Sequence, residues 1–199
     1  ALTADNEPWW EGRPSGTPVI DWQGKPYDKA TATTPAAHPN SRFTVSAKQN
    51  PAYSHLMEHP EGVPISAILF GGRRREVAPL VYEARDWTHG VMIGAGMASE
   101  TTAAAVGQVG VVRRDSMAMK PFCGYNFADY WSHWLSFEGR AKQLPKVYHV
   151  NWFRQDKDGK FLWPGFGDNL RVLSWIIDRC EGRAQAKETP IGFLPRPED

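Results

Sequence analysis

The sequence predicts a mixed fold, α/β to α+β, in which strands and helices alternate around one core. The 199 residues are 41% hydrophobic and 23% charged, an average globular composition that excludes wholesale disorder. From about residue 61, apolar runs of strand length alternate with segments of helical periodicity. Over residues 1–60, Pro, Gly, Thr and Ser separate only short apolar islands, so we expect a loop-rich part there and mixed strands and helices over 61–199.

The loop-rich part holds three apolar islands that predict short strands: Trp9–Trp10, Val19–Trp22 and Arg42–Val45. Beyond it, Val63–Phe70 is a nearly continuous apolar run, which predicts a buried strand that ends at a pair of glycines. A second strand is predicted at Pro79–Ala84.

Helix signals follow these strands. Asp86 predicts the N-cap of a helix to about Ser99, because its carboxylate can accept a backbone hydrogen bond from the first turn. Two later segments carry apolar stripes at i, i+3, i+4 and i+7 spacing. The remaining elements are, in order, a strand at Val111–Arg113, a helix over Phe127–Leu135, a strand at Lys146–Phe153 and a helix over Leu170–Cys180 that ends at Gly182.

Charge and composition exclude several classes of partner. Lys and Arg total 23 against 22 Asp and Glu, so the chain has no global basic surplus for nucleic acid. No apolar run approaches the ~20 residues that span a bilayer, and no signal-peptide pattern opens the chain, so we expect no membrane partner. Cys123 and Cys180 cannot form a disulfide framework, which predicts a reducing, cytoplasmic location.

A polar turn at residues 37–43 is the first candidate site. Pro39 restricts the residue before it, so this is a rigid turn that presents Asn40, Ser41 and Arg42 in succession. The arginine fork suits a carboxylate or a phosphate, and the amide and hydroxyl add neutral hydrogen bonds. The alternative is a turn whose polar groups satisfy one another.

The second candidate is the arginine loop, Gly71–Arg75, at the carboxyl end of the strand predicted at 63–70. Two glycines let a backbone approach a ligand closely, and three arginines follow at once. Ligands of α/β folds bind at the carboxyl ends of strands. The alternative is a solvated basic turn, in which acidic neighbours would have to offset the three cations.

The third candidate is the segment 151–169, where a charged stretch at 156–160 separates two aromatic-rich arms. This pattern predicts a hairpin-like turn that brings the arms together. Phe166 stands between two glycines, a position that suits a slab over a flat ring. Asp168 or Asn169 can cap the last helix, and Asn169 can also bind the edge of a base. A minor aromatic core is an equally good interpretation.

Three other segments carry weaker signals. The small residues from Glu100 to Gly110 predict a mobile loop, because little anchors it. His55–His59 matches a zinc pattern that requires a helix, but Pro51 and Pro60 confine it, so no metal site is expected there. Gly94 and Gly96 lack the third glycine of a dinucleotide fingerprint, which favours close helix packing instead.

Taken together, these stretches resemble a known family. They are, in order, Ala37–Phe43, Pro60–Ile65, Phe70–Arg74, Pro79–Ala84, Ser99–Ala105, Pro121–Phe127, His149–Arg154 and Gly159–Asn169. The chain closely resembles the C-terminal part of GTP-dependent phosphoenolpyruvate carboxykinase. That family converts oxaloacetate and GTP to phosphoenolpyruvate, carbon dioxide and GDP, with manganese or magnesium.

The resemblance implies a role for each matching position. Asn40, Ser41 and Arg42 match its substrate-binding motif, and Arg42 also lies near the transferred phosphoryl group. Arg73 matches an arginine that contacts the nucleotide phosphates. The implied guanine pocket consists of the aromatic walls Trp152, Phe153, Phe161 and Phe166 and the hydrogen-bonding residues Gly167, Asp168 and Asn169. The implied mobile lid covers about 99–110 and includes Ser99, Glu100, Thr102, Ala103, Ala104 and Ala105.

The resemblance also implies an absence. The family's kinase motif, its metal-binding residues and its reactive cysteine match no position of this chain, so we expect the polypeptide to act with the rest of a longer chain and to be inactive alone. The lid departs from the family at Val106-Gly107-Gln108, where an acidic and a basic residue are usual. The alternatives are a stand-alone nucleotide- or glycan-binding module and a purely structural interaction domain.

Overall fold

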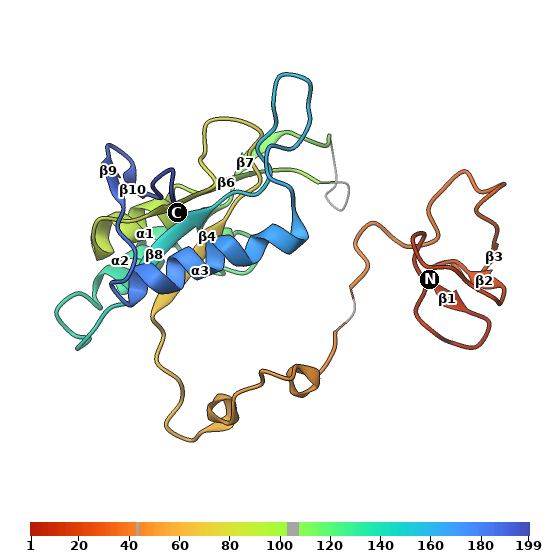
Figure 1. Ribbon diagram of the computed structural model, residues 1–199, viewed down its shortest axis with the longest axis horizontal. Helices are drawn as coiled ribbons and strands as arrows, with labels where there is room; N and C mark the ends of the chain where they lie inside the picture. The colour runs from red at the N-terminus through yellow and green to blue at the C-terminus, as the bar shows by residue number, and fades with distance from the viewer. Residues whose placement is uncertain (43, 103–107) are drawn as a thin grey trace. The chain divides into compact units, whose positions relative to one another are not determined.

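The computed structural model describes residues 1–42, 44–102 and 108–199. These residues form two units, one made of Ala1–Ser54 and one of the described residues from His55 onward (Figure 1). Each unit has its own sheet, and the mixed class predicted from the sequence is confirmed by the second.

The first unit is a small antiparallel sheet around one tryptophan. Its strands are β1 (Leu2–Thr3), β2 (Val19–Ile20) and β3 (Pro26–Tyr27), in that order. The strand predicted at Val19 is confirmed, but those at Trp9–Trp10 and Arg42–Val45 are wrong. Trp9 is instead a core side chain, with its ring centre 5.6 Å from that of Tyr27. The described residues of Arg42–Val45 pair with no strand and are exposed, since a short apolar run forms a strand only beside a partner.

The second unit contains a five-stranded mixed sheet in the order β4-β8-β5-β10-β9. The first pair is parallel and the others are antiparallel. The strands are β4 (Ala67–Gly71), β5 (Val81–Glu83), β8 (Lys146–Val150), β9 (Lys187–Thr189) and β10 (Gly192–Leu194). A separate hairpin pairs β6 (Ala98–Glu100) with β7 (Val112–Arg114).

Helices cover both faces of this sheet. In Figure 1, α3 (Asn169–Cys180) crosses in front of the sheet, and α1 (Trp87–Ala95) and α2 (Phe127–Leu135) lie behind it. Successive side chains of β8 pack on opposite faces of the sheet, because side chains alternate along a strand. Val147 packs in the core with α1, whereas Tyr148 and Val150 pack in the core with α3.

Two glycines let α1 lie directly on the sheet. A Cβ on Gly90 would come within 2.6 Å of the Val147 side chain, and one on Gly94 would come within 2.6 Å of the Phe70 ring. The helix begins as predicted, with the Asp86 carboxylate accepting a hydrogen bond from the His89 amide at 2.7 Å. Close packing at Gly94 is therefore confirmed as the reason for that glycine.

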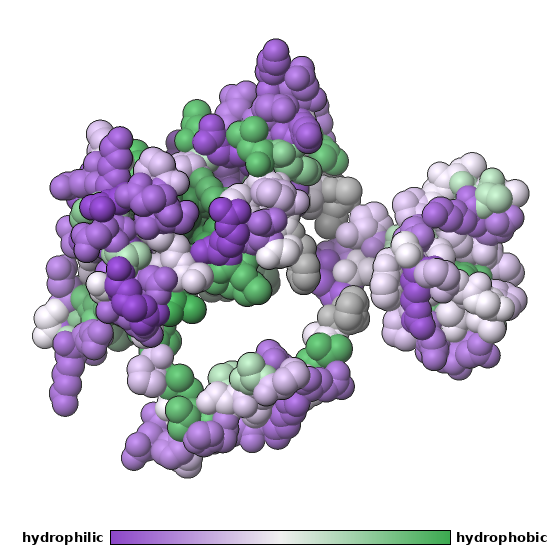
Figure 2. Space-filling model, viewed as in Figure 1, coloured by the Kyte–Doolittle hydropathy of each residue, from purple (hydrophilic) through white to green (hydrophobic). Residues whose placement is uncertain are grey.

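Several element boundaries differ from the predictions. Strand β4 begins at Ala67 rather than at Val63, and α1 ends at Ala95 rather than near Ser99. Residues 44–66 are exposed apart from the half-buried Tyr53, and Figure 2 shows apolar side chains interspersed with polar ones along this segment. The prediction that Val63–Ser66 form part of a buried strand, which rested on hydropathy alone, is therefore wrong. Within the described part of the chain, no helix is long and apolar enough to cross a membrane.

Candidate functional site

The arginine loop leaves the end of β4 and is held by the β6 hairpin. At Gly72 a Cβ would come within 2.7 Å of the Ala98 carbonyl oxygen, so the close approach requires glycine. The Arg73 amide donates to the Ser99 hydroxyl at 3.0 Å, and the Arg75 amide donates to the Glu100 carboxylate at 2.8 Å. The loop is therefore fixed by side chains that lie about 25 residues further along the chain.

The three guanidinium groups of this loop have different surroundings. Arg75 pairs with the buried carboxylate of Glu100 at 2.9 Å, which supplies the acidic neighbour that the sequence required. Arg74 lines a small cavity of about 210 Å³ together with His149. Arg73 lies over the ring of Phe153, with its guanidinium carbon 3.8 Å from the ring centre. Of the three arginines, Arg73 is thus the one whose guanidinium stacks on a ring of the aromatic segment 151–169.

A cavity of about 550 Å³, within the size range of ligand sites, is formed by the segment that connects β8 to α3. We call it the aromatic cavity. Three of its walls, Trp152, Phe153 and Phe161, are among the residues predicted for a base pocket. The full lining is Trp152, Phe153, Lys160, Phe161, Trp163, Pro164, Gly165 and Asn169.

The predicted hairpin-like turn builds this cavity. Gln155 and Phe161 form an antiparallel bridge, and the Asp156 carboxylate accepts the amides of Asp158 and Lys160 at 2.9 Å each. The turn brings Phe161 to Phe153, with ring centres 6.2 Å apart and planes at 73°. This edge-to-face arrangement leaves ring faces that a flat heterocycle can contact.

The N-terminus of α3 closes one side of the cavity. The Asn169 Oδ1 accepts a hydrogen bond from the Trp163 indole at 2.8 Å, which fixes the amide. Gly167 and Asp168 belong to the preceding short helix, Phe166–Asp168, and the Asp168 carboxylate pairs with Arg171 at 3.2 Å instead of capping α3. The side chain of Phe166 lies outside the described part, so its predicted stacking role stays a prediction.

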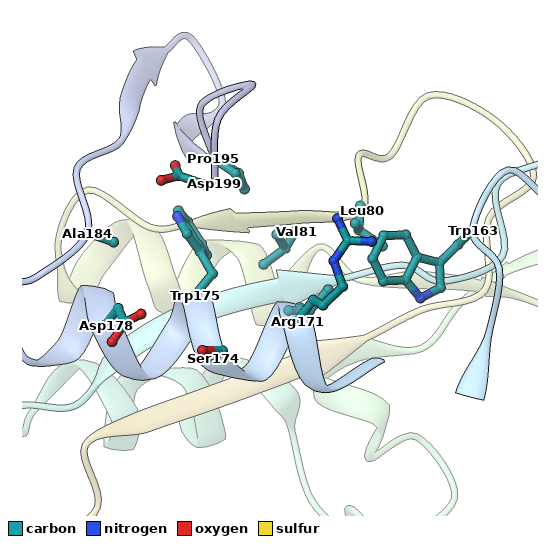
Figure 3. Close-up of a pocket in the computed structure, with 11 residues that line it drawn as sticks. Leu80, Val81, Trp163, Arg171, Ser174, Trp175, Asp178, Ala184, Pro195 and Asp199 are labelled. Carbon is teal, nitrogen blue, oxygen red and sulfur yellow. The ribbon is translucent and has the colours of Figure 1, made fainter. Parts of the chain in front are cut away.

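A second cavity, of about 330 Å³, shares the Trp163 wall. Figure 3 shows Arg171 reaching from α3 toward the Trp163 indole, and the guanidinium carbon lies 5.5 Å from the ring centre. Trp175 and Val81 supply its apolar lining, and Asp178 lies further along α3. Trp163 therefore lines both cavities. This role was not predicted from the sequence, although the place of Trp163 in a Trp-Pro-Gly turn could have suggested it.

The other predicted site residues are placed as follows. Asn40, Ser41 and Arg42 belong to the first unit, in an exposed turn where the Asn40 amide donates to the His38 ring at 3.0 Å. Of the predicted lid, Ser99 and Glu100 form part of β6 and Thr102 follows it. Ala103, Ala104 and Ala105 lie outside the described residues. The base of the predicted lid is thus a strand whose side chains hold the arginine loop.

His149 lies close to Gly72 of this loop, and its burial predicts a stability of the unit that depends on pH. Its ring stacks on Tyr82 at 5.2 Å, and burial together with the nearby Arg74 guanidinium lowers its pKa to about 4 from the usual 6.5. The unfolded chain therefore binds the proton more readily than the folded one, so stability falls as the pH drops from about 6.5 to 4. Lowering the pH to 4 therefore costs the natural protein about 3 kcal/mol of unfolding free energy through this histidine, and we expect His149→Gln to abolish that contribution.

Urea unfolding of the two proteins at pH 7 and pH 4 measures this difference. Other groups titrate in both proteins. The contribution of His149 is therefore the difference between the stability that each protein loses from pH 7 to pH 4. Parallel losses of stability in the two proteins would contradict the assignment.

No group of three or more His, Cys, Asp or Glu side chains that could hold a metal ion occurs among the described residues. His55–Glu58 does form a short 3-10 helix, but its residues are exposed.

The whole chain, residues 1–199, matches the family model described as the phosphoenolpyruvate carboxykinase C-terminal P-loop domain. The chain belongs to this carboxykinase family. It is 59% identical over 197 residues to the phosphoenolpyruvate carboxykinase [GTP] of Anaeromyxobacter dehalogenans strain 2CP-1, covering 98% of this chain and 33% of that protein. The enzyme of the same name from Chlamydia abortus is 59% identical over 199 residues, with the same coverage.

The carboxykinase of Chlamydia trachomatis serovar D is 53% identical over 201 residues and covers the entire chain. In each comparison the chain spans about a third of the length of the curated relative. Membership in the carboxykinase family agrees with the resemblance found from the motifs.

Proposed function

We propose that this chain supplies the nucleotide site of a GTP-dependent phosphoenolpyruvate carboxykinase, which converts oxaloacetate and GTP to phosphoenolpyruvate, carbon dioxide and GDP. The observation that carries the proposal is the position of Arg73, stacked on a ring that lines the aromatic cavity. A flat base with an anionic tail is the ligand class that such a pair of features fits.

In this proposal the rings of Trp152, Phe153 and Phe161 hold guanine, joined by Phe166. Gly167, Asp168 and Asn169 supply hydrogen bonds to the edge of the base. Arg73 neutralises the phosphates, which matters because phosphoryl transfer depends on positioning and on stabilisation of charge.

The remaining roles rest on the family resemblance. Asn40 and Ser41 bind oxaloacetate or phosphoenolpyruvate, and Arg42 lies near the transferred phosphoryl group. The lid, from Ser99 to about Gly110, excludes water from the reacting groups. Manganese or magnesium would supply charge neutralisation in the complete enzyme, which we propose is cytoplasmic.

A chimaera tests the function with this chain's own residues. In it, the matching third of the Anaeromyxobacter dehalogenans carboxykinase is replaced by residues 1–199. We expect GTP-dependent formation of phosphoenolpyruvate from oxaloacetate in the presence of manganese. A chimaera that folds, by circular dichroism, and yet shows no GTP-dependent turnover would contradict the proposal.

The isolated chain of 199 residues is expected to bind GDP without catalysing turnover. Calorimetric titration with GDP, ADP and simple glycans separates this from the alternatives. Heat of binding for GDP supports a nucleotide site, glycan binding supports the stand-alone module, and manganese-dependent turnover by the isolated chain would refute its predicted inactivity.

Asn169→Ala in the chimaera is expected to raise the KM for GTP about tenfold and to leave the KM for oxaloacetate unchanged. The change removes a hydrogen-bonding group at the cavity and also leaves the Trp163 indole without its acceptor. Steady-state kinetics with each substrate varied in turn measures the two effects. Equal effects on both KM values would argue against a base-binding role.

A further inference from the structure

One fully buried amide, Asn151, connects the arginine loop to the aromatic cavity. Asn151 follows the last residue of β8 and is only 2% exposed. It stands immediately before the two aromatic walls Trp152 and Phe153. The arginine loop lies 77 residues earlier in the chain, so contact between them is entirely tertiary.

The Asn151 side chain makes four hydrogen bonds, and both of its polar atoms are used. Its Oδ1 accepts from the Arg74 amide at 3.1 Å and from the Phe153 amide at 3.2 Å. Its Nδ2 donates to the carbonyl oxygens of Arg74 at 2.9 Å and Ala78 at 3.0 Å. One side chain thus holds both backbone groups of Arg74 and the backbone of Phe153.

These hydrogen bonds fix the positions of Arg73 and Phe153, the two residues that the nucleotide would contact. Arg73 precedes the held residue Arg74, and its guanidinium lies over the ring of Phe153, the other held residue. Only an amide offers two donors and two acceptor lone pairs on one planar group, so neither Asp nor Leu can replace this set of bonds. Loss of the amide would free the loop and the wall to move independently.

We propose that Asn151 is a positioning residue for the nucleotide, which acts by holding Arg73 in register with the Phe153 wall. The inference rests on the proposed function, because it specifies how that site keeps its base-binding and phosphate-binding parts at a fixed separation. Asn151 is buried and acts through Arg73.

The test is steady-state kinetics of the chimaera with Asn151→Ala, Asn151→Ser, Arg73→Ala and the double variant Asn151→Ala, Arg73→Ala. We expect Asn151→Ala to raise the KM for GTP about tenfold and to leave the KM for oxaloacetate within about twofold. In the Arg73→Ala background the same change is expected to have almost no further effect on the KM for GTP. Such non-additivity is the signature of two residues that act as one unit.

Asn126→Ala is the matched control. Asn126 caps α2 through its Oδ1, which accepts the Ala128 amide at 2.8 Å, so its loss destabilises the same unit without touching the loop. The control is expected to lower the melting temperature and to leave both KM values unchanged. Should Asn151→Ala fail to fold, Asn151→Ser introduces no charge, retains a hydroxyl that can donate and accept, and is expected to show the same selective rise in the KM for GTP.

The outcomes separate the two proposals. No GTP-dependent turnover by the unsubstituted chimaera would overturn the proposed function and this inference with it. Normal turnover, with an unchanged KM for GTP in both Asn151 variants, would overturn the inference alone. An equal rise with and without Arg73 would do the same, because it would show that Asn151 does not act through Arg73.

Discussion

Arg73→Ala is expected to lower kcat/KM for GTP about 100-fold in the chimaera and to abolish the preference of the isolated chain for GDP over guanosine. The guanidinium is the cation placed on a wall of the aromatic cavity, and hydrogen bonds between charged groups contribute about 1.5–3 kcal/mol each. Guanosine carries no phosphate, so its affinity should stay the same. Calorimetry with the two ligands and kinetics with GTP measure the effect.

Arg74→Ala is the matched control for this variant. It removes the same charge from the adjacent residue, but that side chain lines the separate cavity with His149. A change in net charge alone would lower GDP affinity equally in both variants. A loss of guanosine affinity in Arg73→Ala that equals the loss of GDP affinity would also contradict a phosphate-binding role.

Local signals predicted those parts of the fold that local chemistry controls. The Asp86 cap, the turn at Asp156–Lys160 and the apolar stripe of α3 each depend on residues within a few positions of one another. Each was predicted from the sequence and is confirmed. The physical reason is that caps, turns and amphipathic faces need no distant partner.

Strand boundaries depended on distant residues and were predicted less well. Val63 and Ile65 are as apolar as the residues of β4, but β8 pairs only with Ala67–Gly71. Likewise, Glu100 was assigned to a mobile loop from the small residues that follow it, and Ser99 to the end of a helix. Pairing with Arg113 and Val112 makes them a strand, because a ladder partner can override composition.

The candidate site shows the same division. The family resemblance implied Arg73 for the phosphates and the aromatic segment for the base, but the residues alone could not decide among three successive arginines. The structure distinguishes them: Glu100 pairs with the Arg75 guanidinium, and Asn151 holds the backbone of Arg74, whose side chain lines the separate cavity with His149. Both partners are more than 20 residues away in the sequence, where neither periodicity nor spacing can locate them.

Glu83→Ala is expected to destabilise the second unit by about 3–5 kcal/mol, a large part of a typical folding free energy. Glu83 is 4% exposed, and its carboxylate pairs with Arg179 of α3 at 2.6 Å and with Lys146 of β8 at 3.0 Å. Its loss would leave the Arg179 guanidinium, whose side chain is 16% exposed, buried without that carboxylate. The midpoint of urea unfolding, followed by tryptophan fluorescence, measures the change.

Glu188→Ala removes the same side chain from an exposed position of β9 and is expected to change the stability by less than about 0.5 kcal/mol. A second comparison separates the buried charge from the lost contacts. Replacing Glu83 and Arg179 by apolar residues, Glu83→Leu with Arg179→Met, should recover most of the stability, because the buried guanidinium is then gone. Lys146, the other partner of Glu83, has a side chain that is 38% exposed and keeps its hydrogen bond to the backbone carbonyl of residue 179. A double variant as unstable as Glu83→Ala would show that the shape of the pair, rather than the stranded guanidinium, determines how α3 is held against the sheet.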